Sequence, residues 1–174
     1  DLQRKISEAV NCGPFAKTIA YNYYGNGLKK SFTDPGGATY EYTYDRNNRL
    51  GAIDIPGQGL ITYNSYQWNS PIKVSMPGGS TTQYTYDPLM RVKAILAKDP
   101  GQNPTVTRQY EYSATGNITS KNTEHGDYSY QYDALYRLAQ ADNPTLPHEA
   151  YTYDTLGNRI TAAGISGQWT YNAN

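Results

Sequence analysis

Hydrophobic and polar positions alternate along most of the chain, in short stretches that turn-forming residues separate. Residues 40–44, Tyr-Glu-Tyr-Thr-Tyr, show the period of two that places every second side chain on one face of a β-strand. Asp-Pro-Gly-Gly at residues 34–37 and Met-Pro-Gly-Gly at residues 76–79 interrupt the pattern with strong turn signals. The pattern therefore predicts an all-β chain of short strands joined by tight turns.

A motif of the form Tyr-x-Tyr-Asp, followed by a short turn and an aliphatic residue, recurs along the chain. Its mean period is roughly 21 residues, within the range of stacked repeats. The copy that begins at Tyr151 is interpreted as carrying one extra residue after its turn glycine, and weaker copies begin at Tyr21 and Tyr66. The repeated residues, for which we expect a structural role, are Tyr42, Tyr44, Asp45, Tyr84, Tyr86, Asp87, Tyr110, Tyr112, Gly116, Tyr130, Tyr132, Asp133, Tyr151, Tyr153, Asp154 and Gly157.

Each copy is expected to form an antiparallel β-hairpin with the aspartate at the first position of a type I turn. There its carboxylate can accept hydrogen bonds from backbone N–H groups ahead of it. The position three residues later requires a positive φ, which Gly116, Gly157 and Asn48 tolerate well. Met90 and Tyr136 occupy the same position, so either those two turns are of another type or they carry strain.

The register of the return strand follows from the same turn. Leu50 is expected opposite Tyr44, and Asp45 is expected to face Arg49 across the neck of the hairpin. About seven such units predict on the order of fourteen strands, joined in sequence as antiparallel neighbours.

The first residues of the chain have a different pattern. Leu2, Ile6, Ala9 and Val10 have helix-like spacing, which predicts a short helix in a lead-in segment of residues 1–18. Residues 19–174 are expected to form a single repeat domain that ends within a further repeat. No apolar run approaches the roughly 20 residues of a membrane helix.

The composition agrees with this interpretation and limits the kinds of partner that the chain is expected to bind. Tyrosine occurs 19 times, whereas phenylalanine and tryptophan occur twice each, and tyrosine favours strands. The 15 basic and 15 acidic side chains balance to a net charge of zero, and no basic tract is present. A nucleic-acid partner is therefore not expected, because it would require a cationic surface.

The turn aspartates Asp45, Asp87, Asp133 and Asp154 could in principle be paired acid and base groups, as in glycoside hydrolysis. Their recurrence in successive turns favours a structural role, because an active site needs one constellation whereas a structural device repeats. We therefore expect no catalytic residues.

The potential metal ligands are few. His125 and His148 are the only histidines and lie in polar, loop-like stretches, where a metal site would need more clustered ligands. Cys12 is the only cysteine, which excludes a disulfide within one chain and favours an unreactive structural thiol. No metal and no cofactor is expected.

The tyrosine ladder supports two interpretations. Rows of exposed aromatic rings bind sugars in many proteins, which would make the chain a carbohydrate-binding or adhesive cell-surface module. Cross-strand packing needs the same rings on the same face and is the interpretation that we favour.

The repeated motif, Tyr-x-Tyr-Asp-x-x-Gly-Asn/Arg-Leu/Ile, resembles that of the RHS/YD-repeat family from Ile19 onward. The family includes bacterial Rhs proteins, the C components of insecticidal toxin complexes, wall-associated bacterial proteins and the teneurins. The resemblance implies a curved sheet, or a segment of a β-ribbon that spirals into a hollow shell. In the bacterial toxins the shell encloses a C-terminal toxic domain, and in the teneurins it belongs to an adhesion receptor.

From this resemblance we expect a non-enzymatic shell segment of a secreted or cell-surface bacterial protein, part of a cage that encapsulates and delivers a toxin. Its partners would be the rest of its own shell and the enclosed toxin domain, with glycans as partners under the alternative. The self-cleaving segment and the toxin domain have no counterpart in this sequence, so neither activity transfers to a residue here. The fragment alone is expected to self-associate, through its edge strands or its tyrosine-rich face.

Overall fold

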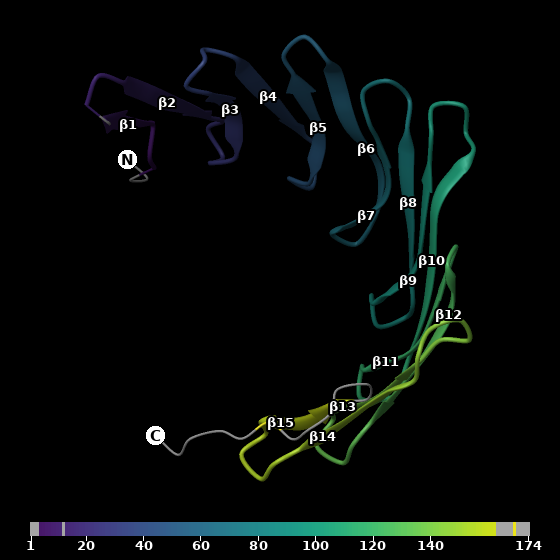
Figure 1. Ribbon diagram of the computed structural model, residues 1–174. Coiled ribbons are helices and arrows are strands. Elements are labelled where there is room, and N and C mark those ends of the chain that lie inside the picture. Colours follow the sequence, from purple (N-terminus) through teal and green to yellow (C-terminus); the bar gives the residue numbers. More distant parts are fainter. Residues whose placement is uncertain (1–3, 12, 163–168, 170–174) are drawn as a thin grey trace. The chain divides into compact units, whose positions relative to one another are not determined.

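The computed structural model describes residues 4–11, 13–162 and 169, and within this part of the chain every regular element is a β-strand. Fifteen strands follow one another in sequence order, and each hydrogen-bonds to its chain neighbours (Figure 1). All the pairings between strands are antiparallel, as the hairpin repeat predicted. The expected all-β hairpin array is confirmed.

The strands are short because a turn follows each of them within a few residues. They are β1 (Ser7–Asn11), β2 (Ala16–Tyr23), β3 (Lys29–Thr33), β4 (Thr39–Tyr44), β5 (Leu50–Ile55), β6 (Gly59–Gln67), β7 (Ser70–Ser75), β8 (Thr81–Tyr86), β9 (Val92–Lys98), β10 (Pro104–Tyr112), β11 (Ile118–Thr123), β12 (Gly126–Tyr132), β13 (Leu138–Asp142), β14 (Glu149–Tyr153) and β15 (Arg159–Ala162).

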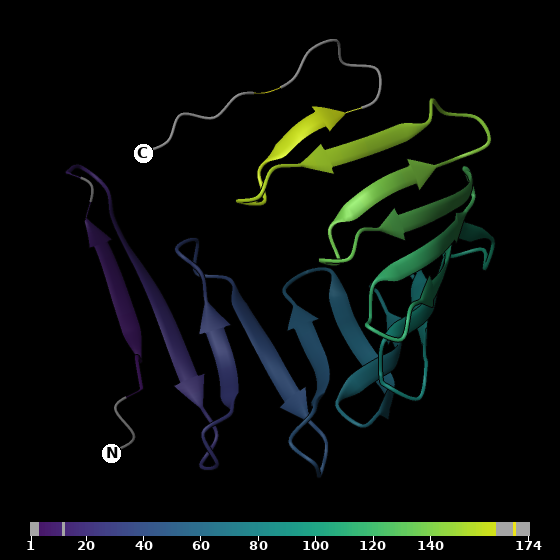
Figure 2. The ribbon, with the colours of Figure 1, turned by 90° about the horizontal axis from the view of Figure 1, so that it is seen from below.

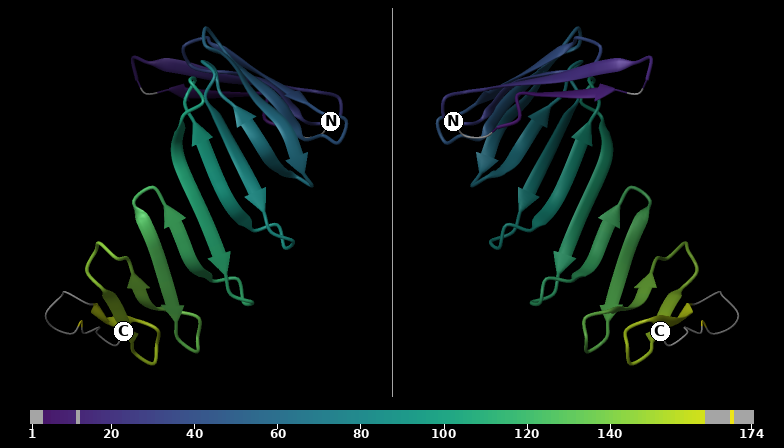
Figure 3. Two further views of the ribbon diagram at one scale, coloured as in Figure 1. Left: turned by 90° about the vertical axis from the view of Figure 1, so that its right-hand side faces the viewer. Right: turned by 90° about the vertical axis from the view of Figure 1, so that its left-hand side faces the viewer.

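The chain divides into two compact units. Unit 1 consists of Asp1–Tyr84 and Ala97–Pro104, and unit 2 consists of Thr85–Leu96 and Thr105–Asn174. Unit 1 contains the hairpins from β1 to β7, which lie side by side in Figure 2. Unit 2 contains β11 to β15 and most of β10, which follow one another in Figure 3.

The turn that begins at Asp45 shows the geometry of the repeat. The Asn48 N–H donates to the Asp45 carbonyl at 3.0 Å, and the Asp45 N–H donates to the Arg49 carbonyl at 2.8 Å. Asn48 has a φ of 61°, so the hairpin is a type I turn closed by a bulge. Beyond it Tyr44 pairs with Leu50, as expected. The same backbone hydrogen bonds recur in the turns that begin at Asp87, Ser113, Asp133 and Asp154.

Two details of the sequence interpretation need correction or completion. The Tyr151 copy has no extra residue, because Asn158 occupies the place of Arg49 and donates its backbone N–H to Asp154 at 2.8 Å. Met90 and Tyr136 both have a φ of 62°, so their turns keep the common type and carry the backbone strain.

The expected helix near the N-terminus is wrong. Residues Ser7–Asn11 form β1, which pairs with β2 in the register Glu8 with Ile19 and Val10 with Lys17. A helix of this length is marginal on its own, whereas β2 offers a row of backbone partners. Residues Ser7–Asn11 of the lead-in segment are therefore part of the sheet.

Because side chains alternate along a strand, the two tyrosines of a Tyr-x-Tyr pair lie on the same face of the sheet, here called the tyrosine face. In unit 1 cross-strand pairing aligns Tyr21, Phe32 and Tyr40, whose ring centroids lie 5.6 Å apart in succession. Within each unit the described strands form a single layer that buries little, and Val74, 6% exposed, is the one buried apolar residue among those described. Stability must therefore come largely from contacts within the sheet.

Among the described residues there is no helix of the length and apolar character that a membrane crossing by helices requires.

Candidate functional site

The turn carboxylates bind their own turns. Asp45 Oδ1 accepts the backbone N–H groups of Asn47 at 2.8 Å and Arg49 at 2.9 Å. Its other oxygen, Oδ2, accepts the Arg49 Nε–H at 2.7 Å. Asp87 and Asp133 bind their turns in the same way. Each carboxylate is thus used twice, once for the turn backbone and once to orient an arginine.

These hydrogen bonds shift the acidity of the carboxyl groups. The backbone N–H and side chain of Arg49 hold the pKa of Asp45 below its ordinary value of 3.8. Burial raises the pKa of Asp87, but hydrogen bonds from Arg91 outweigh it, so that pKa is also lowered. Hydrogen bonds lower the pKa of Asp133 and Asp154 as well. Carboxyl groups of this kind are ionised at neutral pH and are poor general acids.

The oriented arginines reach the next hairpin. Arg91 donates an N–H to the Ser113 carbonyl at 3.1 Å, and Arg137 donates one to the Asp154 carbonyl at 3.3 Å. In unit 1 Arg49 donates to the Trp68 carbonyl at 2.7 Å. Every acceptor is a backbone carbonyl at the end of the following hairpin.

A tyrosine from that following hairpin completes each contact. The Arg91 guanidinium lies 4.5 Å from the centre of the Tyr112 ring, and the Tyr112 hydroxyl donates to the Val92 carbonyl at 2.7 Å. Arg137 and Tyr153 repeat this arrangement at 4.4 Å, where the Tyr153 hydroxyl donates to Leu138 at 2.7 Å. We call this set of an arginine and the tyrosine of the next hairpin the inter-repeat clasp.

The clasp also occurs in unit 1, with Arg49 lying 4.6 Å from the Tyr66 ring centre and the Tyr66 hydroxyl donating to the Leu50 carbonyl. Where Asn117 replaces the arginine, Tyr132 still donates to the Ile118 carbonyl at 2.8 Å. The tyrosine hydroxyl bond is therefore kept when the cation is absent.

The structure places the sequence-predicted residues in these elements. The Tyr-x-Tyr pairs lie in β4, β8, β10, β12 and β14, with the turn residues at the hairpin ends. The structural role of these residues stays a prediction, although the contacts above are consistent with it. Sequence reasoning interpreted Arg49 as a partner of Asp45 alone and missed the bridge to the next hairpin. Arginine recurring four residues after the aspartate was the available signal.

Other tyrosines of the tyrosine face interact with lysines or with each other. In unit 1 the Lys29 ammonium lies 5.5 Å from the Tyr21 ring centre and 5.3 Å from that of Tyr42. Burial raises the pKa of Tyr42, and in unit 2 it raises the pKa of Tyr130 and Tyr132. The face is thus partly covered by its own side chains, which leaves less ring surface for a ligand.

Each of the two histidines lies beside a carboxylate. His125 lies 3.5 Å from Glu124, and the His148 Nδ1 contacts Asp142. Within the part of the chain that the structure describes, no three His, Cys, Asp or Glu side chains are grouped as metal ligands. Cys12 lies outside the described residues.

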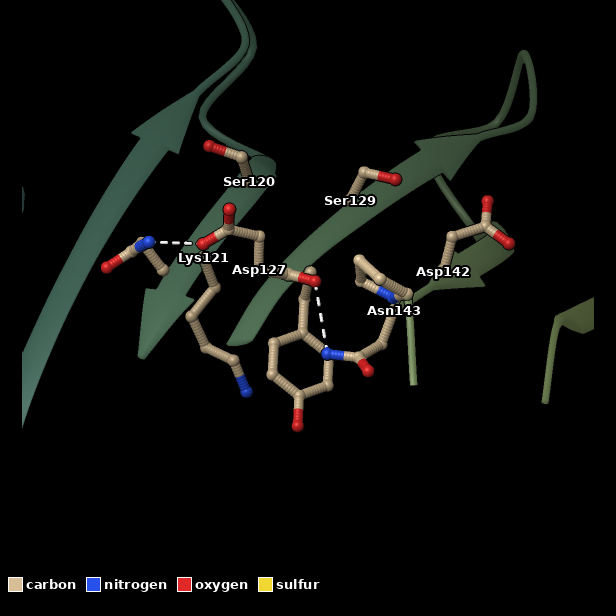
Figure 4. A pocket seen from close by; sticks show the side chains of 9 residues that line it. Ser120, Lys121, Asp127, Ser129, Asp142 and Asn143 are labelled. Carbon is tan, nitrogen blue, oxygen red and sulfur yellow. Dashed lines mark hydrogen bonds between the residues drawn. The ribbon is translucent and has the colours of Figure 1, made fainter. Parts of the chain in front are cut away.

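One hollow, of about 580 Å³, lies on β11, β12 and the end of β13 in unit 2 (Figure 4). Asp127 accepts a hydrogen bond from the Asn122 amide, and the Asn143 amide donates to the Asp127 carbonyl at 3.1 Å. The Lys121 ammonium lies 4.1 Å from the centre of the Tyr128 ring. The hollow is open, and the hydroxyl, amide and carboxylate groups that line it are of the kind that hydrogen-bond a polar ligand.

No family model and no curated protein matches this chain. Solved structures with a similar fold belong to Tc toxins. A Photorhabdus luminescens Tc holotoxin pore with a mutant TccC3 is 20% identical over 84% of this chain and 9% of that chain, with a TM-score of 0.71. TcdB2-TccC3 without its hypervariable C-terminal region is 19% identical over 90% of this chain and 10% of that chain, with a TM-score of 0.74. The TcdB2-TccC3 structure is 18% identical over 90% and 10% of the two chains, with a TM-score of 0.72.

At these identities the likeness establishes the fold. The likeness to these Tc toxin structures confirms, at the level of the fold, the resemblance seen in the sequence. The chain spans about a tenth of the length of the structures that it matches.

Proposed function

We propose that this chain is a structural, non-enzymatic segment of a repeat shell, in a secreted or cell-surface bacterial protein that encloses and delivers a C-terminal toxin domain. The observation that carries the proposal is the inter-repeat clasp. It joins the hairpins of Asp45, Asp87 and Asp133 each to the hairpin that follows, through backbone carbonyls, which suits a wall built by repetition.

The similarity to solved structures also supports the proposed shell function. The similar structures include a Tc holotoxin pore, and TcdB2-TccC3 has a hypervariable C-terminal region. A wall that separates a cargo from solvent needs continuity between neighbouring hairpins rather than a reactive centre. The contacts of Arg49, Arg91 and Arg137 supply that continuity.

The test is protease protection of the full-length protein that contains this chain. We expect any domain that follows the repeats to resist limited proteolysis while the wall is intact. Replacing Arg91 and Arg137 together by alanine should open the wall and expose that domain to cleavage.

A matched control replaces Arg46, an exposed arginine at a hairpin end, by alanine, and this should leave the protection unchanged. Cleavage of the following domain at the same rate in the wild-type protein and in unfolded protein would contradict the proposal. A substrate-dependent activity that maps to this chain would contradict its non-enzymatic part.

The hollow on β11 to β13 favours a second candidate, a glycan-binding or adhesive module. Its lining offers the hydroxyl, amide and carboxylate groups that recognise sugar hydroxyls, next to the Tyr128 ring. Lys121 lies close to that ring, so a sugar would have to displace the ammonium to stack on it.

Binding to a glycan array, followed by calorimetry on the best ligand, tests this second function. Tyr128→Ala and Asp142→Asn should each weaken the binding, whereas Asp54→Asn in unit 1 should not. Absence of binding to any glycan by the folded chain would rule it out.

A further inference from the structure

Arg4, which precedes the first strand, occupies the position of a clasp arginine. Its guanidinium lies 5.1 Å from the centre of the Tyr23 ring. The Tyr23 hydroxyl donates to the carbonyl of Lys5, the residue after Arg4, at 2.9 Å. Arg91 and Tyr112 show the same arrangement, in which the hydroxyl donates to the residue after the arginine. In the sequence, a leucine stands two residues before Arg4, as it does before Arg91. Arg4 and Tyr23 therefore form a further inter-repeat clasp.

This clasp lacks the two acceptors that hold the other arginines. In the Arg91 clasp, Asp87 accepts the arginine Nε–H and the Ser113 carbonyl accepts an N–H from Nη1. Arg4 Nη1 is buried, and no residue in the described part of the chain accepts a hydrogen bond from it. Glu8, the described acid nearest in sequence, pairs with Lys5 at 2.6 Å. A buried N–H group without an acceptor is unfavourable, so it indicates a missing partner.

The turn beyond Tyr23 already offers one of the two acceptors. Gly27 has a φ of 93°, and the Cβ of any other residue there would lie 2.6 Å from Arg4 Nη1, so the arginine lies directly against this turn. Tyr24 directly follows the clasp tyrosine, which is the place of Ser113 in the Arg91 clasp. The Tyr24 carbonyl is therefore the acceptor that Nη1 would reach in a complete clasp, and the carboxylate is the group still missing.

The strand that follows Arg4 also lacks a neighbour. In unit 1, β5 follows Arg49 and lies between β4, which carries a Tyr-x-Tyr pair, and β6, which carries the clasp tyrosine Tyr66. In unit 2, β13 follows Arg137 and lies in the same way between β12 and β14. Among the described strands, β1 pairs with β2 alone (Figure 1). The neighbour expected by analogy is a Tyr-x-Tyr strand that ends in a turn carboxylate.

We propose that Arg4 and the free edge of β1 form an acceptor site for one further strand of the Tyr-x-Tyr-Asp type. The strand pairs antiparallel with β1, and its aspartate accepts the Arg4 Nε–H. The carboxylate then holds the guanidinium so that Nη1 donates to the Tyr24 carbonyl, because a planar guanidinium can serve both partners at once.

The other clasps supply the choice of partner. At Arg49, Arg91 and Arg137 the group that accepts the Nε–H is a turn aspartate four residues earlier, at 2.6–2.7 Å. A small anion would satisfy the arginine alone, whereas a Tyr-x-Tyr-Asp strand satisfies the arginine and the backbone edge together. The inference rests on the repeat-wall part of the function proposed above and not on the enclosed domain.

The test adds this strand to the chain. Residues 40–45, Tyr-Glu-Tyr-Thr-Tyr-Asp, are copied directly ahead of Asp1, so that the added aspartate stands four residues before Arg4, as Asp45 stands before Arg49. Hydrogen exchange followed by nuclear magnetic resonance reports on the β1 amides that face away from β2. We expect these amides to exchange at least about tenfold more slowly than in the chain without the addition.

Replacing the added aspartate by asparagine separates the Arg4 contact from strand pairing alone. Asparagine still caps the turn through its side-chain oxygen but carries no charge, so the protection of β1 should fall about tenfold. Arg4→Ala should abolish this difference between the two added strands, because the partner of the charge is gone. Arg46→Ala, at an exposed hairpin end, is the control and should leave the difference unchanged.

Equal exchange rates with added aspartate and added asparagine would overturn the proposal, as would a difference that persists in Arg4→Ala. Unprotected β1 amides in an extended chain whose other strands stay protected would also overturn it. Protection of β1 in the unextended chain that grows with concentration would assign the edge to a second copy and overturn the choice of partner. Protease protection of a following domain is measured separately, so the proposed function and this inference can fail independently.

Discussion

Arg91 and Tyr112 belong to successive hairpins of unit 2, and the guanidinium of the first lies 4.5 Å from the ring centre of the second. The same arginine donates to the Ser113 carbonyl at 3.1 Å and to its own turn aspartate, Asp87, at 2.6 Å. One side chain thus connects a turn carboxylate, an aromatic ring and the backbone of the next repeat. Because the described strands of each unit form a single layer with little burial, contacts of this type replace a conventional core.

Replacing Arg91 by alanine should lower the free energy of unfolding by about 1–2 kcal/mol, through loss of the carbonyl hydrogen bond and the ring contact. Urea denaturation would measure this. Arg91→Lys should recover only part of the loss, since an ammonium lacks the planar fork that serves both partners. Arg46→Ala, at an exposed hairpin end, is the control and should change stability by less than about 0.5 kcal/mol.

The tyrosine hydroxyls of the clasp should contribute separately. Tyr112→Phe removes the donor to the Val92 carbonyl and should destabilise the chain by about 0.5–1.5 kcal/mol. Tyr136→Phe removes a hydroxyl at an exposed hairpin end and serves as the matched control. Equal melting temperatures for Tyr112→Phe and the wild type would show that the hydrogen bond to Val92 adds nothing to stability.

Acid should weaken the fold through the turn aspartates. Hydrogen bonds lower the folded-state pKa of Asp45, Asp99 and Asp133 below the ordinary value of 3.8. A group whose pKa is depressed by folding contributes stability above its unfolded pKa and loses it as the pH falls through its folded pKa. Stability should therefore be constant near neutrality and fall below about pH 4. Thermal melts of Asp45→Asn with Asp133→Asn should show a shallower fall than those of the wild type.

Alkali should also weaken the fold, through the tyrosine face. Burial raises the pKa of Tyr42, Tyr44 and Tyr132 above the ordinary value of 10.0. Groups whose pKa is raised by folding contribute stability below the unfolded pKa and lose it as the pH rises through the folded pKa. Ultraviolet titration should therefore show tyrosines that ionise later in the folded chain than in urea. Coincident titration curves would contradict this.

A substitution at Met90 can measure how much the positive φ at this turn position destabilises the chain. Met90→Gly keeps the turn and removes the side chain from a φ of 62°, so it should leave stability unchanged or raise it by up to about 1 kcal/mol. The same change at Thr115, which is not among the positive-φ residues, should destabilise because glycine loses more backbone entropy. Thermal unfolding of the two variants would decide between strain relief and a general effect of glycine.

Local features of the fold were predictable from the sequence because the groups involved lie within a few residues of each other. The pairing of Tyr44 with Leu50 and of Asp45 with Arg49 follows from one turn and its hydrogen bonds. The alternation of side chains then assigns the tyrosines to one face without further information.

Tertiary structure decided the features that depend on a neighbouring hairpin. Ile6 and Val10 have helical spacing, yet pairing with β2 places the segment between them in a strand, because backbone partners outweigh weak local propensity. The reach of Arg91 to Ser113 depends on the separation of two hairpins, which no local pattern specifies. The exposure of Leu135 could be known only from the structure, because the sequence does not distinguish a leucine at a hairpin end from one on a buried face.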